Sequence, residues 1–85
     1  MDYDIIWKSK AIKQARKLPE ADRKNVYGTV DKLKIKAKWA NVKALTNHQY
    51  DFRLRVGNYR VLFNCEEEIK ILEIEEVKKR DERTY

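Results

Sequence analysis

The chain has 85 residues, of which 42% are apolar and 40% are charged, a balance typical of one globular domain with a heavily charged surface. Lys and Arg number 20 against 14 Asp and Glu, and the resulting net charge of +6 favours nucleic acid or an acidic protein as a partner. No apolar run approaches the ~20 residues that span a bilayer, and Met1–Asp4 lacks the basic start of a signal peptide. We therefore expect a cytoplasmic protein with no membrane partner.

Cys65 is the only cysteine and His48 the only histidine. A single thiol excludes an internal disulfide, and one thiol with one histidine cannot build a zinc site of the usual spacing. The sequence also lacks a glycine-rich nucleotide loop and a Ser-His-Asp set. We expect neither a metal nor a cofactor, so core packing must supply the stability.

The first half of the chain predicts one strand and two helices. Residues 3–8 are rich in β-formers and predict a strand, after which Ser9 is placed to cap a helix that runs to about Leu18. Pro19 ends this helix and opens a second one, which should fade near Ala37. The expected buried face of the second helix carries Val26, Val30 and Leu33.

The second half predicts three antiparallel strands. Residues 39–49 have no clean period and predict only a connection, whereas the hairpin 50–63 and the run 69–74 alternate as strands do. The order strand, helix, helix, strand, strand, strand predicts a single α+β domain over residues 1–85, a βααβββ arrangement. A two-helix hairpin should cover one face of its antiparallel sheet and leave the other face partly open.

The hairpin carries the most informative pattern of the chain. Gly57-Asn58 between two alternating runs predicts a two-residue type II′ turn, in which Gly57 has a positive φ. This turn places Arg55 opposite Arg60, with Arg53 diagonal to Arg60 on the same side. Three guanidinium groups should therefore gather on the open face of the sheet.

Folding alone gives no reason for this cluster, because opposed like charges destabilise a sheet by up to about 1 kcal/mol. Two kinds of anion could lie among the arginines: carboxylates of the next strand, such as Glu73 or Glu75, or a phosphodiester of a partner. Arg, Lys and Tyr side chains suit phosphate binding, base stacking and stabilisation of a phosphorane. RNA fits well, since its 2′-hydroxyl is an internal nucleophile that needs only alignment, charge stabilisation and proton transfer.

Four segments in this order and spacing resemble the RelE branch of the RelE/ParE toxins from bacterial type II toxin–antitoxin systems. They are Lys17-Leu18-Pro19, Asn41–Leu45, the hairpin Tyr50–Phe63 and the ending Lys79–Tyr85. The resemblance spans essentially the whole chain and implies a RelE-like microbial RNase fold. It also implies a metal-independent endoribonuclease that cleaves mRNA in the decoding site of the ribosome and so inhibits translation. The implied partners are a cognate RelB-like antitoxin, mRNA, and the ribosome with its 16S ribosomal RNA.

The resemblance also implies roles for individual residues. Arg60 is expected to stabilise the developing phosphorane charge, and Tyr85 to stack on the cleaved nucleotide or exchange protons there. The expected catalytic set is Arg53, Arg60, Arg80 and Tyr85. The expected RNA-binding set is Arg55, Lys43, Lys78, Lys79 and Arg83. Arginine holds its proton too tightly to be a ready base, so Tyr85, Asp51 through a water, and a deprotonated Lys79 all stay open as the general base.

Two alternatives belong to other classes of function. The ParE branch shares the fold yet poisons DNA gyrase, so a noncatalytic gyrase poison is the alternative reading. A simple RNA-binding module is the third reading, in which each basic residue should contribute a similar share of the affinity.

Overall fold

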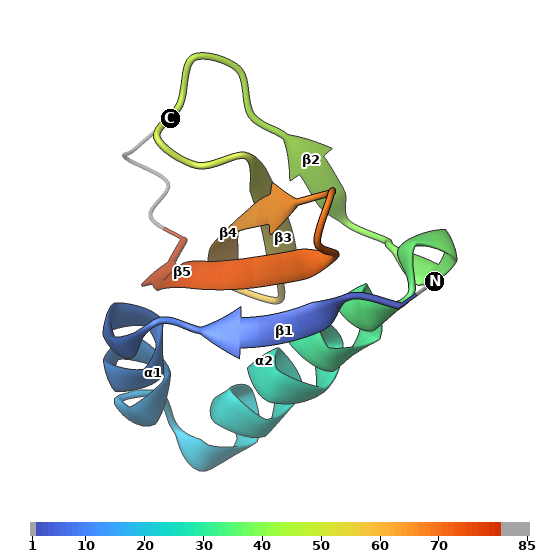
Figure 1. The fold of residues 1–85 in the computed structure, drawn as a ribbon. Coiled ribbons are helices and arrows are strands. Elements are labelled where there is room, and N and C mark those ends of the chain that lie inside the picture. The colour runs from blue at the N-terminus through green and yellow to red at the C-terminus, as the bar shows by residue number, and fades with distance from the viewer. Residues whose placement is uncertain (1, 81–85) are drawn as a thin grey trace.

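A computed structural model describes residues 2–80 of the chain. Its elements in chain order are β1 (Asp4–Trp7), α1 (Ser9–Arg16), α2 (Glu20–Asp31), two 3₁₀ turns (Lys32–Lys34 and Lys36–Lys38), β2 (Val42–Ala44), β3 (Phe52–Val56), β4 (Tyr59–Glu66) and β5 (Ile71–Lys79). Both helices lie on the same side of the sheet (Figure 1). Within this part of the chain, no helix has the length and apolar composition that crossing a membrane requires.

The strands form one sheet in the order β1-β5-β4-β3-β2, with β1 parallel to β5 and the other pairs antiparallel. The expected α+β class, with helices on one face of a mostly antiparallel sheet, is confirmed. The sheet has one strand more than expected, because Val42–Ala44 pairs with β3. Interpreting residues 39–49 as a connection alone was therefore wrong. Three residues are too few for an alternation pattern, and pairing with β3 defines this strand.

The helix boundaries follow the sequence signals only in part. Pro19 is the N-cap of α2, as expected, but Lys8 rather than Ser9 precedes the first turn of α1, and that turn receives no side-chain cap from the described residues. The α-helix ends at Asp31 instead of fading near Ala37, since the chain tightens into the two 3₁₀ turns.

The core lies between the helices and the sheet. Its buried side chains include Ala11, Ala15, Val26, Val30, Leu33, Leu54, Val56, Val61, Phe63, Leu72, Ile74 and Val77. Trp39 packs at the edge of this core, where its ring meets Phe52 and Phe63 edge-on at centroid distances of 5.4 and 5.6 Å. Its Nε1 also donates to the Leu33 carbonyl at 2.7 Å. The helix side of the sheet thus carries the core, and the other face is not covered by the helices.

Candidate anion-binding site

The hairpin between β3 and β4 has the predicted register. Gly57 has a φ of 55°, and Arg55 pairs directly with Arg60. Leu54 and Val61, one step along each strand, are buried in the core. Because neighbouring side chains of a strand point to opposite faces, the arginines lie on the face away from the helices, called here the arginine face.

Two rows of paired residues cross the arginine face. One row runs from Arg55 through Arg60 to Lys78, and the second runs through Lys43, Arg53, Leu62 and Glu76. Lys43 and Lys78 therefore share the face with the arginines. Lys79 pairs with Tyr59, whose ring packs against the core, so the pleat directs Lys79 to the helix side of the sheet.

Four arginines line one small pocket on this face: Arg53, Arg55, Arg60 and Arg80. Arg80 follows β5 and is held near the hairpin turn, because its backbone N–H donates to the Asn58 carbonyl at 2.6 Å. The volume of this arginine pocket is about 70 Å³. Pockets that bury drug-sized molecules measure roughly 300–1,000 Å³, so the arginine pocket suits a single oxyanion group. Tyr85 and Arg83 lie outside the described residues.

The positive charges of the arginines repel one another and so destabilise the charged form of each guanidinium group. Burial lowers the pKa of Arg60, and the neighbouring charges of Arg53 and Arg80 lower it further. The Nε of Arg53 is buried and has no hydrogen-bond partner among residues 2–80. Leaving such a donor unsatisfied costs about 1–3 kcal/mol. An anion in the pocket could accept a hydrogen bond from this Nε and offset the repulsion among the arginines.

The two carboxylates considered as alternative partners are engaged elsewhere. Glu73 Oε2 lies 3.3 Å from Lys8 Nζ, and Glu75 Oε2 accepts a hydrogen bond from Asn64 Nδ2 at 3.5 Å. Neither of these two carboxylates is therefore shown as the partner of the arginine pocket.

Tyr50, in the segment 45–51, covers part of the arginine face. Tyr50 donates from its hydroxyl to Glu76 Oε2 at 2.7 Å, and Leu62 and Glu76 beneath it are both 5% exposed. Asp51, one of the candidate bases, does not line the arginine pocket, and its Oδ2 accepts the backbone N–H of Cys65. Glu76 could not be predicted as a residue of this face, because the backbone irregularity that turns it there leaves no mark in the residue pattern.

No model of a protein family matches the chain, and no curated protein sequence matches it either. Solved structures do match. The archaeal RelE–RelB complex from Pyrococcus horikoshii OT3 aligns with a TM-score of 0.81 and 24% identity, over 96% of this chain and 99% of that one. The RelBE2 toxin–antitoxin complex from Mycobacterium tuberculosis gives 0.80 and 23%, over 94% and 100%. The isolated RelE toxin of E. coli gives 0.72 and 18%, over 93% and 85%.

These structural likenesses define the class of fold: an α+β domain of the kind seen in the toxins of toxin–antitoxin complexes. More particularly, the chain has the RelE fold, as the resemblance of its four sequence segments implied.

Proposed function

We propose that the chain is the toxin of a type II toxin–antitoxin system and a metal-independent endoribonuclease that cleaves mRNA in the decoding site of the ribosome. One observation carries the proposal. On the face of a RelE fold that the helices leave open, two hairpin strands and the end of β5 bring four arginines around a pocket of oxyanion size. Such an activity belongs in the cytoplasm, where the ribosome and mRNA are.

The proposed chemistry needs little more than alignment and positive charge. The 2′-hydroxyl of a nucleotide gives its proton to a base and its oxygen attacks the adjacent phosphorus, which forms a 2′,3′-cyclic phosphate. The bond from phosphorus to the 5′-oxygen of the next nucleotide breaks, and that oxygen takes up a proton. Negative charge grows on the non-bridging oxygens during this step, and the guanidinium groups of Arg53, Arg60 and Arg80 stabilise it. A single well-placed donor of this kind contributes roughly 3–4 kcal/mol, or about 10²–10³-fold in rate. Tyr85 is proposed to stack on the cleaved nucleotide or to exchange a proton there.

The flanking cations fit a nucleic-acid strand. Arg55 lines the pocket, while Lys43 and Lys78 lie in the two rows of the arginine face and can contact neighbouring phosphates. Contacts of this kind supply affinity that depends on salt but not on sequence. Arg83 remains a predicted further contact. Lys79 faces the helix side of the sheet and is not included.

A cognate RelB-like antitoxin is the proposed protein partner. Two of the similar structures are toxin–antitoxin complexes, which supports this assignment. The net charge of +6 further suits an acidic partner.

The test is a reconstituted translation reaction with purified ribosomes, a defined mRNA and mapping of the new RNA ends. Wild-type protein should give cuts that are phased with codons and that require ribosomes. Arg60→Ala should reduce the rate by about 10²-fold or more. Arg16→Ala is the matched control, because it removes the same charge from an exposed position on α1. DNA damage without mRNA cleavage would replace this proposal with a ParE-like gyrase poison.

A further inference from the structure

A bulge in β5 decides which of its residues face the arginine pocket. The register between β4 and β5 shifts by one residue, so that Glu75 is the extra residue. Before the bulge Ile74 faces the core, and after it Val77 does. Glu76 and Lys78 consequently turn to the arginine face. A regular strand would have put the carboxylate of Glu76 into the apolar core.

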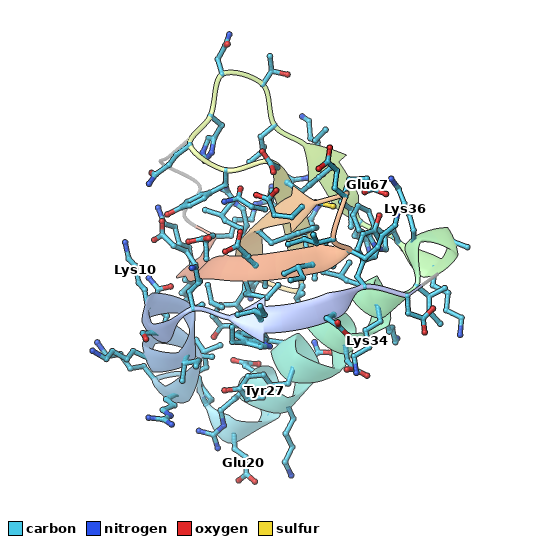
Figure 2. All side chains as sticks on the ribbon, viewed as in Figure 1. Lys10, Glu20, Tyr27, Lys34, Lys36 and Glu67 are labelled. Carbon is cyan, nitrogen blue, oxygen red and sulfur yellow. The ribbon has the colours of Figure 1, made fainter. Side chains whose placement is uncertain are left out.

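The carboxylate of Glu76 joins three separate parts of the chain. Its Oε2 accepts the Tyr50 hydroxyl at 2.7 Å, and its Oε1 lies 3.2 Å from Lys10 Nζ and 3.8 Å from Lys78 Nζ. Figure 2 shows Lys10 on α1 beside the sheet. Burial by itself raises the pKa of Glu76, but the hydrogen bonds from Tyr50 and Lys10 and the charge of Lys78 bring it below its ordinary value. The group is therefore ionised at neutral pH.

This buried charge lies next to the arginine pocket. Lys78 pairs in register with Arg60, whose pKa is already lowered by burial and by the charges of Arg53 and Arg80. Another ammonium group here is repelled by its neighbours, and the carboxylate of Glu76 offsets that repulsion. A buried carboxylate stabilises a fold less than an apolar side chain of similar size would, so its presence calls for a purpose beyond packing.

We propose that Glu76 is a positioning residue of the arginine pocket. Its carboxylate fixes Lys78 beside Arg60 as a further cation of the anion site, and through Tyr50 it holds segment 45–51 over the adjoining part of the arginine face. The inference rests on the proposed function for the identity of the anion, an RNA phosphate. The positioning of Lys78 by Glu76 can be tested with any oxyanion that binds the arginine pocket.

Titration of the purified chain with inorganic phosphate, followed by NMR of the arginine Nε–Hε groups, measures this effect directly. Glu76→Gln keeps the shape of the side chain and an oxygen for Tyr50, but removes the charge that holds Lys78. We expect the affinity for phosphate to fall about tenfold, because the loss of one charge-assisted contact to the anion typically has an effect of this size. If only net charge mattered, Glu76→Gln would instead bind phosphate more tightly, because it removes a carboxylate near a cationic pocket. Unchanged or tighter binding would overturn the inference.

Glu73→Gln is the matched control. It removes one carboxylate from the same strand, but the lysine that Glu73 pairs with is Lys8, which lies outside the row formed by Arg55, Arg60 and Lys78. Phosphate affinity should stay the same or rise slightly, and a loss as large as that of Glu76→Gln would contradict a specific role. If circular dichroism shows that Glu76→Gln does not fold, Lys78→Met replaces it. That variant keeps most of the side-chain length and loses the charge that Glu76 holds beside Arg60, so wild-type phosphate affinity in it would refute the inference.

The translation reaction separates this inference from the proposed function. If wild-type protein leaves mRNA intact, the proposed function fails, while weaker phosphate binding by Glu76→Gln still supports the positioning role. If wild-type protein cleaves, Glu76→Gln should lower kcat by about 10- to 10²-fold with a smaller change in KM, as expected for a misplaced group. Wild-type kcat in that variant overturns the inference and leaves the proposed function intact.

Discussion

The two glycines of the chain make a matched pair for testing how backbone conformation contributes to stability. A Cβ atom added at Gly28 or at Gly57 meets no atom within 4 Å in the described part of the chain, so neither substitution causes a clash there. The sites differ in their backbone. Gly57 has a φ of +55° in the hairpin turn, whereas Gly28 lies inside α2 and has no such left-handed φ. The absence of close neighbours also rules out close packing as the reason for a glycine at position 28.

Opposite effects are expected from the same added methyl group. Gly28→Ala should raise the free energy of unfolding by about 0.5–1 kcal/mol, because alanine favours the helix and restricts the unfolded chain. For a domain of this size that is a Tm increase of roughly 2–8 °C. Gly57→Ala should lower the free energy of unfolding by about 1–2 kcal/mol, the cost of a left-handed conformation with a Cβ.

Urea unfolding followed by circular dichroism measures both changes, and an unaltered m-value in each variant checks that the unfolded states are comparable. Shifts of the same sign in both variants would refute the reasoning, because the helix at Gly28 accepts a Cβ atom whereas the positive φ at Gly57 disfavours one. Gly28→Ala should leave mRNA cleavage unchanged, since α2 is on the other side of the sheet from the arginine face.

Three further outcomes are expected. Lys78→Ala should make the slope of log affinity for single-stranded RNA against log salt concentration less steep by about 0.7, whereas Lys79→Ala should leave that slope unchanged. Equal changes in both variants would show that RNA binding does not depend on which face of the sheet a lysine occupies. The hydrogen bond from Lys70 is the main reason that the pKa of Glu67 falls to about 2. A glutamate in the unfolded chain has a pKa of about 4.3. The stabilisation of the fold by ionised Glu67 is therefore complete above that pH and is lost as the pH falls toward 2. Glu67→Gln should flatten Tm over this acid range, and an unchanged acid profile would contradict the assignment. Trp39→Phe removes a hydrogen bond to a main-chain carbonyl and should destabilise by about 1–3 kcal/mol in thermal unfolding, whereas wild-type Tm would argue against that bond.

The hairpin shows why part of the site could be predicted from sequence. A two-residue turn fixes register, and strict alternation then fixes the face of every side chain, so the pairing of Arg55 with Arg60 followed from local rules. Pro19 likewise marks the start of α2 because its ring restricts the backbone around it.

Other features depend on contacts between distant segments. The strand Val42–Ala44 is too short to show a period and exists because β3 offers it an open edge. The bulge at Glu75 inverts the faces of the residues that follow, and alternation rules that assume a regular strand place Glu76 and Lys79 on the wrong sides. Arg80 could be assigned to the site only through the resemblance, because its approach to the turn depends on a backbone hydrogen bond to Asn58.

The central place of β5 in the sheet has a consequence for how the domain is assembled. β1 and β4 are both bound to β5, although β5 is the last strand of the described chain to be synthesised (Figure 1). The β1–β5 pairing joins residues 4–7 with residues 71–74, and pairings over such long sequence separations form slowly, since the entropy of closing the loop is lost before the contacts form. A nascent chain that stops before Ile71 has neither a closed sheet nor Arg80, so on the proposed function it cannot attack the ribosome that is making it.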